Sequence, residues 1–100
     1  MGCPSKRVTT GLCGSALLRD LDLALTLIEA VVKAVKVPVT LKTRLGWDDT
    51  LLNAPDLARR AEAAGIRMVT IHGRTRCQFY KGHADWAAIR AVKDAVKIPV

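Results

Sequence analysis

The chain has 100 residues, a mass of 10.8 kDa and a hydrophobic content of 50%, which is enough for one small domain with a packed core. No apolar stretch reaches the ~18 residues that span a bilayer, and the first residues lack the features of a secretory signal, so we expect a cytoplasmic protein that binds no membrane. Three cysteines without C-x-x-C spacing predict no disulfide framework and no metal site, whereas the net charge of +7 favours a polyanionic partner.

The first predicted elements are a strand end, a helix and a strand. The segment Gly2-Cys3-Pro4 has the glycine and proline that suit a strand end and a turn. Asp20 is a candidate N-cap of a helix that ends near Lys36. The apolar residues of this helix, spaced by three and four, are Ala24, Leu27, Ile28, Val31 and Val35. The residues Val39–Arg44 alternate and include β-branched side chains, which predicts a strand.

The same order returns in the second half of the chain. Asn53 as N-cap and Gly65 after the last turn predict a second helix. Val69–Arg74 repeats the pattern of the first strand and predicts a second one. A third helix is expected after Asp85, with a further strand starting at Ile98-Pro99-Val100. The apolar side of the third helix carries Trp86, Ile89, Val92 and Val96.

The repeat of about 30 residues matches one strand with its crossover helix. Strands that alternate with helices predict parallel pairing and right-handed crossovers, hence either a doubly wound sheet or a (β/α)₈ barrel. The near-equal period favours the barrel. A complete barrel needs ~250 residues, so we expect an α/β fold that is part of a (β/α)₈ TIM barrel, with about three βα units and parallel strands.

Polar side chains line one face of each predicted strand, because successive side chains point to opposite faces. These residues are Thr40, Lys42 and Arg44 on the first strand and Thr70, His72 and Arg74 on the second. The apolar faces must pack against helices, which leaves the polar set facing the barrel interior. Its charged members lie toward the C-terminal strand ends, where barrel enzymes keep their active sites. We predict that these cations bind an anion or an electron-rich ring.

Cys3 follows the first predicted strand end. It is therefore expected at the same C-terminal end of the barrel, which we call the mouth. A thiol is mostly protonated at neutral pH and can donate a proton, whereas nearby cations favour the nucleophilic thiolate. The alternative role of a cysteine is that of a small buried hydrophobic residue. That alternative suits Cys13 and Cys77 better.

Three segments of the chain together carry a family resemblance. They are Gly2-Cys3-Pro4 followed by Gly14-Ser15-Ala16-Leu17-Leu18, then Val39–Asp48 (VTLKTRLGWD), then Thr70–Arg76 (TIHGRTR). In their order and separation they resemble the signatures of the tRNA-dihydrouridine synthase family, most closely its bacterial FMN-dependent branch. The similarity covers essentially the whole chain.

This resemblance implies an enzyme that reduces the C5=C6 bond of uridines in tRNA, with FMN as cofactor and NADPH as reductant. It implies that Cys3 is the general acid at C5, that Lys42 and His72 contact the flavin, and that Arg44 is a cation beside substrate or flavin. The residues expected to bind tRNA around the mouth are Lys6, Arg7, Arg74, Arg76 and Lys81, with Phe79 or Tyr80 as a candidate for base stacking.

The resemblance also implies that residues 1–100 are a fragment of the FMN-binding barrel domain. The family's first strands would precede Met1. Its last strands, with the flavin phosphate site, and its C-terminal helical tRNA-binding domain would follow Val100. We therefore expect weak or no FMN binding by this chain alone.

Three other interpretations are compatible with the residues. Lys42 could form a Schiff base in a barrel aldolase or decarboxylase, because a lysine desolvated inside a barrel can act as a nucleophile. The chain could be a truncated product that binds RNA without catalysis, through its basic loops. Open strand edges could instead make it fold poorly and aggregate. The sequence does not decide which uridine is modified or whether the protein forms oligomers.

Overall fold

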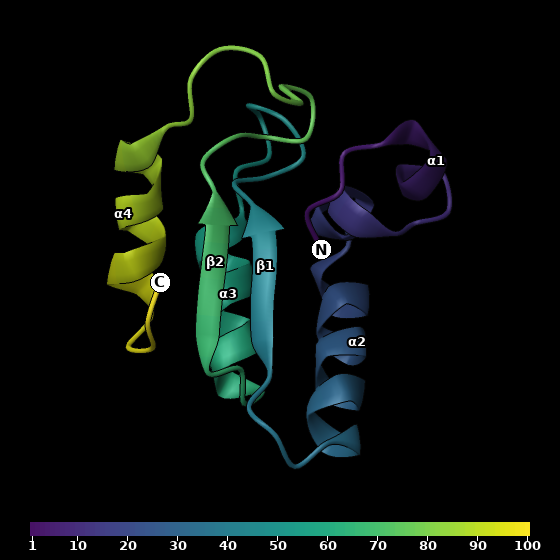
Figure 1. Cartoon of the computed structure of the whole chain (residues 1–100), viewed down its shortest axis with the longest axis vertical. Coiled ribbons are helices and arrows are strands. Elements are labelled where there is room, and N and C mark those ends of the chain that lie inside the picture. Colours follow the sequence, from purple (N-terminus) through teal and green to yellow (C-terminus); the bar gives the residue numbers. More distant parts are fainter.

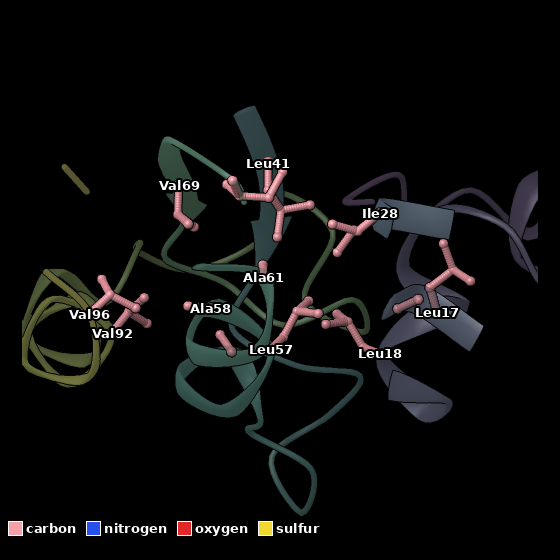
Figure 2. Packing of buried hydrophobic residues seen from close by; sticks show 13 residues of the cluster. Leu17, Leu18, Ile28, Leu41, Leu57, Ala58, Ala61, Val69, Val92 and Val96 are labelled. Atoms are coloured by element: carbon pink, nitrogen blue, oxygen red, sulfur yellow. The ribbon is translucent and has the colours of Figure 1, made fainter. Parts of the chain in front are cut away.

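The computed structural model describes every residue from Met1 to Val100 and shows a mixed α/β arrangement (Figure 1). In chain order the elements are α1 (Lys6–Thr9), the 3₁₀ helix η1 (Gly14–Arg19), α2 (Leu21–Ala34), β1 (Thr40–Arg44), α3 (Ala54–Ala63), β2 (Met68–His72) and α4 (Trp86–Ala95). The strands are parallel neighbours. The helices α2, α3 and α4 form a layer against one face of this sheet (Figures 1 and 2). None of the helices has the length and apolar character needed to cross a membrane.

The sheet has two strands, fewer than the sequence predicted. A segment on each side of it makes a single backbone hydrogen bond to a strand. The Met1 nitrogen donates to the Lys42 carbonyl at 2.8 Å on one side. The Val69 nitrogen donates to the Pro99 carbonyl at 3.0 Å on the other side. A regular ladder needs repeated bonds, so the segments around Cys3 and Pro99 lie where further strands were expected without forming them. The parallel α/β arrangement is confirmed, whereas the chain by itself does not display a complete barrel.

The helix boundaries follow local capping signals with one exception. The side chains of Asp20 and Asp85 accept hydrogen bonds from Leu23 and Ala88, as N-caps of α2 and α4 should. Asn53 precedes α3 but its side chain does not cap the helix. Its amide instead donates to the Leu18 carbonyl at 2.7 Å, which ties α3 to η1. The helix α2 ends at Ala34 with Val35 as its C-cap, close to the end expected near Lys36.

The N-terminal part contains two helices that the sequence did not predict. Lys6 and Arg7, expected in a loop, lie in the short helix α1, and Gly14–Arg19 forms η1. Both elements are too short for a periodic apolar pattern to reveal them.

The hydrophobic core lies between the sheet and the helix layer (Figure 2). Leu57 of α3 is completely buried at its centre, between Leu18 of η1 and the strands. Leu41 and Val69 contribute from the covered faces of β1 and β2, and Val92 contributes from α4. Each fully buried aliphatic side chain stabilises the fold by roughly 1.5–3 kcal/mol relative to its exposure to water.

Not every apolar residue expected in the core is buried. Trp86 is 80% exposed, because it occupies the first position of α4 and the chain enters this helix from a long loop. Leu27, Val31 and Val35 are between 41% and 50% exposed, because α2 packs against α3 and η1 only through its other side. The apolar spacing thus located the helix correctly but not the fraction of its apolar side that is covered.

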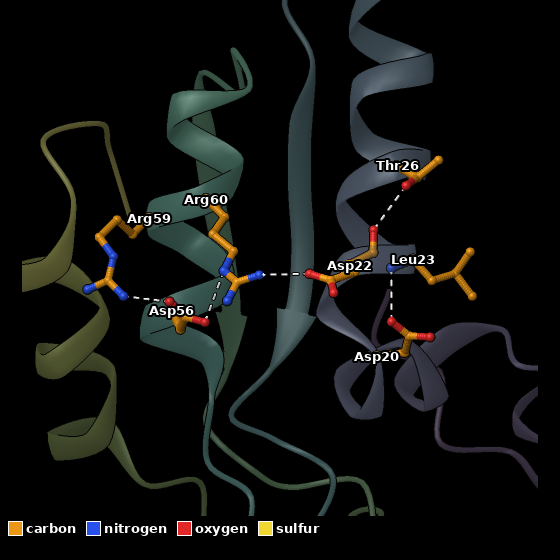
Figure 3. A network of polar contacts seen from close by, with 7 residues as sticks. All are labelled: Asp20, Asp22, Leu23, Thr26, Asp56, Arg59 and Arg60. Atoms are coloured by element: carbon orange, nitrogen blue, oxygen red, sulfur yellow. Dashed lines mark hydrogen bonds and ion pairs between the residues drawn. The ribbon is translucent and has the colours of Figure 1, made fainter.

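One ion pair connects two helices on their solvent-facing side, and others lie within a single helix (Figure 3). Arg60 of α3 contacts both Asp22 of α2 and Asp56 of its own helix at 3.1 Å. Asp56 also pairs with Arg59. Glu62 of α3 accepts hydrogen bonds from two backbone nitrogens near Ile98. Arg60 thus links α3 to α2, and Glu62 links α3 to the segment after α4.

Candidate active site

A hollow of about 330 Å³ opens at the C-terminal ends of the two strands. Its lining includes Gly2, Cys3, Lys42, Arg44, His72 and Tyr80. These residues come from the N-terminal segment, from both strands and from the loop after β2 (Figure 1). The strand register places Arg44 opposite His72. The structure therefore brings together Cys3, Lys42, Arg44 and His72, as the alternation of side chains along the strands predicted, while their individual roles stay predictions.

The backbone around Cys3 is held firmly although its thiol is exposed. The Ser15 nitrogen donates to the Cys3 carbonyl, and the Ser15 hydroxyl donates to the Gly2 carbonyl, both at 2.9 Å. Gly14 permits this close approach, since it has a φ of +58° and a Cβ there would lie 2.6 Å from the Cys3 carbonyl oxygen. The completely buried Ser15 thereby fixes the position from which Cys3 enters the hollow.

Arg44 lies at the base of the hollow, is only 2% exposed and donates hydrogen bonds to distant parts of the backbone. Its Nε donates to the Gly2 carbonyl at 3.0 Å. Its Nη1 donates to the carbonyls of Thr75 and Phe79 at 3.0 and 2.7 Å. Burial lowers the pKa of Arg44, and the neighbouring Tyr80 counteracts part of this effect. Three of its five N–H groups are thus used to join the N-terminal segment to the loop after β2.

His72 is held in one tautomer by Arg74. The Nη1 of Arg74 lies 3.0 Å from His72 Nε2, and because arginine can only donate, Nε2 accepts and the ring proton of neutral His72 resides on Nδ1. Burial, followed by the charges of Arg44, Arg74 and Lys42, lowers the pKa of His72 below its usual 6.5. The Tyr80 ring tilts against the imidazole at a centroid distance of 5.9 Å. At neutral pH His72 therefore presents a neutral N–H donor.

The loop between Gly73 and Asp85 is held by a backbone hydrogen bond between its ends and by side-chain hydrogen bonds within it. The Asp85 nitrogen donates to the Gly73 carbonyl at 2.6 Å. Inside the loop, Arg74 donates to the carbonyls of Lys81 and Gly82 at 3.2 and 2.9 Å. Arg74, expected to bind tRNA phosphate, thus has its Nε and both terminal nitrogens in contacts within the chain.

Lys42 is exposed on the open face of β1 and lines the hollow with its side chain. In this chain it lacks the desolvation on which the Schiff-base alternative depends. No other lysine lines the hollow.

The remaining predicted residues lie outside this hollow. Lys6 and Arg76 line a neighbouring hollow, and Arg7 is exposed on α1. Cys13 and Cys77 bond locally, to the Gly11 carbonyl and with the Thr75 hydroxyl. No group of three or more histidine, cysteine or acidic side chains is arranged to hold a metal ion.

Sequence reasoning gave no role to Ser15 or Trp47, and it did not single out Arg19. Ser15 lies within the quoted Gly14–Leu18 segment, where the pair of a glycine and a small hydroxyl residue was the available signal. Trp47 lies against the guanidinium groups of both Arg19 and Arg76. No local pattern reveals this cluster, because Arg19 and Arg76 are 28 and 29 residues away from Trp47 along the chain.

Comparison with known proteins identifies the family of the chain. The sequence matches the family model described as "Dihydrouridine synthase (Dus)" over residues 1–100. The chain belongs to the dihydrouridine synthase family.

Relatives within this family match the whole chain. It is similar to a protein named "Probable tRNA-dihydrouridine synthase" from Rhizobium leguminosarum bv. phaseoli, with 67% identity over 100% of the chain and 32% of the relative. A protein of the same name from Rhodobacter capsulatus is 66% identical over 100% of the chain and 31% of the relative. It is also 54% identical, over 100% of the chain and 31% of the relative, to "tRNA-dihydrouridine synthase B" of Vibrio cholerae. The chain thus spans about a third of the length of these curated relatives.

Proposed function

We propose that the protein containing this chain is an FMN-dependent tRNA-dihydrouridine synthase, which reduces the C5=C6 bond of uridine with NADPH as the electron source. The supporting observation is the hollow at the strand ends, in which the accessible thiol of Cys3 lies with Lys42, Arg44 and His72. The names of the relatives point to the same reaction. The net reaction adds a hydride to C6 and a proton to C5 of the uracil ring.

Cys3 is the proposed proton donor to C5. Its thiol is exposed to the hollow, while hydrogen bonds from Ser15 fix the backbone on both sides of it. The guanidinium group of Arg44 lines the same hollow as Cys3. After proton transfer to C5, the thiol takes up a new proton from solvent.

Lys42 and His72 are the proposed contacts of the flavin. When bound, FMN supplies the hydride for C6. The donors in the hollow suit the pyrimidine edge of the flavin ring, because this edge carries carbonyl oxygens and becomes negative on reduction. Lys42 offers an ammonium group, and the lowered pKa of His72 leaves a neutral N–H donor.

tRNA is the proposed macromolecular partner. The cations at the strand ends make no ion pair, since every ion pair of the chain lies on α2, α3 or α4. Such cations are suited to phosphate, whose binding releases counterions. Because tRNA is the substrate, we place the protein in the cytoplasm.

We further propose that residues 1–100 form one part of a longer (β/α)₈ barrel domain. This proposal is supported by the coverage of about a third of the relatives, and by the single bonds at Met1 and Val69 on either side of the sheet. In this proposal the flavin phosphate site and a helical tRNA-binding domain belong to other parts of that protein.

The decisive test begins by reading the DNA on both sides of this coding sequence and expressing the full-length protein. With FMN, NADPH and unmodified tRNA, we expect uridines to gain two hydrogen atoms, measured by mass spectrometry of the digested tRNA. A full-length protein that binds FMN but leaves all uridines unreduced would contradict the proposal. Salt-sensitive tRNA binding without reduction would support the alternative of a non-catalytic RNA-binding protein.

A further inference from the structure

A second hollow, of about 360 Å³, lies directly beside the Cys3 hollow. Its lining includes Pro4, Lys6, Arg19, Trp47, Arg76 and Phe79. Pro4 lines both hollows, and the consecutive residues Phe79 and Tyr80 line one hollow each. A ligand that extends beyond the Cys3 hollow on this side would therefore enter the second one.

Trp47 holds two arginines at this hollow. The guanidinium carbons of Arg19 and Arg76 lie 4.2 and 3.9 Å from the centre of its ring. The ring of Trp47 thus lies against both guanidinium groups. Stacking uses the flat faces of the guanidinium groups and leaves their N–H edges free for hydrogen bonds.

The backbone makes this arrangement rigid. The Trp47 nitrogen donates to the Leu51 carbonyl, and the Arg76 nitrogen donates to the Gly46 carbonyl, at 3.1 and 3.0 Å. Gly46 is needed here, because a Cβ at this position would lie 1.9 Å from the Leu51 carbonyl oxygen. Trp47 and Arg76 are thus fixed relative to each other, across the loops that follow β1 and β2.

The cations of this hollow have no acceptor within the protein. The side chains of Lys6, Arg19 and Arg76 make no hydrogen bond and no ion pair, and the Nε of Arg76 is buried without an acceptor. Arg44 and Arg74 differ, since both donate to backbone carbonyls. A hydrogen bond from Thr50 and the charge of Arg76 lower the pKa of Asp48, yet Asp48 and Arg76 form no ion pair.

We propose, on the basis of the function proposed above, that this second hollow binds the RNA phosphodiester next to the reacting uridine. Arg19 and Arg76 bind the phosphate oxygens through their N–H edges, Lys6 adds a third positive charge, and Trp47 holds the two arginines in place. The uridine then reaches the Cys3 hollow with its neighbouring phosphate already bound, which restricts the orientation of the base relative to the thiol.

The test uses Trp47 as its reporter. The chain has two tryptophans, and Trp86 is 80% exposed, so Trp86→Phe leaves Trp47 as the single tryptophan with little effect on packing. This protein is titrated with a uridine hexanucleotide, with the nucleoside uridine and with inorganic phosphate. We expect a saturable change in Trp47 fluorescence with the hexanucleotide, a much weaker response to inorganic phosphate and none to uridine.

Substitutions then assign the response to the arginines. Arg19→Gln and Arg76→Gln should each raise the Kd for the hexanucleotide about tenfold. Each should also reduce the slope of log Kd against log salt by about 0.7. The matched control is Arg90→Gln, an arginine on α4 that pairs with Asp94, which should leave both quantities unchanged. Circular dichroism checks that each variant is folded, and Lys6→Gln, expected to raise the Kd two- to threefold, provides the test should an arginine variant unfold.

Several outcomes would overturn the phosphate site. These are no fluorescence response of the parent to the hexanucleotide, an equal response to uridine, equal affinity for inorganic phosphate, or the same loss in Arg90→Gln as in Arg19→Gln. The catalytic proposal is judged separately. A full-length protein that forms no dihydrouridine while Trp47 still reports hexanucleotide binding would contradict catalysis and support the phosphate site.

Discussion

The helix layer and the mouth at the strand ends differ in how their charged side chains are paired. In the helix layer, acidic and basic side chains meet in ion pairs, such as Asp22 with Arg60 (Figure 3) and Asp94 with Arg90. At the mouth, Lys6, Lys42 and Arg76 have no acidic partner within ion-pair distance. These cations of the mouth are therefore available to an anionic ligand.

This difference separates stability from function. Exposed ion pairs contribute only about 0–1 kcal/mol each, so the helix layer owes its stability mainly to the apolar core beneath it. Clustered cations repel one another and oppose folding. A protein retains such a cluster where an anionic ligand neutralises it, and local rules of stability are commonly broken at functional sites. We therefore expect substitutions in the two regions to affect different measurements.

The largest effect is expected from Cys3→Ala in the full-length protein. Removal of the proposed general acid should lower the rate of dihydrouridine formation about 10²–10⁴-fold. The free energy of unfolding should hardly change, because the side chain is exposed. Cys13→Ala is the matched control and should retain normal activity. Equal activity of the two variants would exclude Cys3 as the acid.

The next effect is expected in the helix layer, from Leu57→Ala. Leu57 is completely buried, and its truncation should lower the free energy of unfolding by about 2–5 kcal/mol, measured by urea denaturation. Leu27→Ala, at a position that is 44% exposed, should have a much smaller effect. Similar losses in both variants would mean that the core does not lie where the structure places it.

Ser15→Ala connects the two regions. Loss of the hydroxyl leaves the Gly2 carbonyl with the Arg44 bond alone and should lower the free energy of unfolding by about 1 kcal/mol. Because Ser15 positions Cys3, the kcat of the full-length protein should fall while the KM for tRNA stays constant. Ser15→Thr should restore part of the kcat by restoring the hydroxyl. A loss of stability without any change in kcat would argue against a positioning role.

The smallest effect concerns His72 and pH. Its pKa is lowered in the folded chain, so the unfolded chain binds more protons below pH 6.5, and stability falls as the pH decreases from there. His72→Gln should flatten this dependence, whereas His83→Gln should leave the His72 contribution intact. Thermal unfolding between pH 5 and 7.5 measures both. An unchanged slope in His72→Gln would contradict the proposed environment of this ring.

Part of the site follows from sequence alone. The alternation of side chains along two parallel strands predicted that Lys42, Arg44 and His72 share one face, and the structure confirms this grouping. The N-cap at Asp20 was predicted as well, and so was the start of a helix after Asp85. These features depend on interactions between residues that are close in sequence, and strand periodicity and capping act over only a few positions.

Only the tertiary structure decided the rest. The bonds from Arg44 to Gly2, Thr75 and Phe79 span 42, 31 and 35 residues, and the Asn53 bond to Leu18 spans 35. The same holds for the arginines around Trp47 and for the exposure of Leu27. The sequence determined which side chains belong to each face of an element. Which partner each side chain meets depends on how segments distant in sequence pack together, and no local pattern encodes that packing.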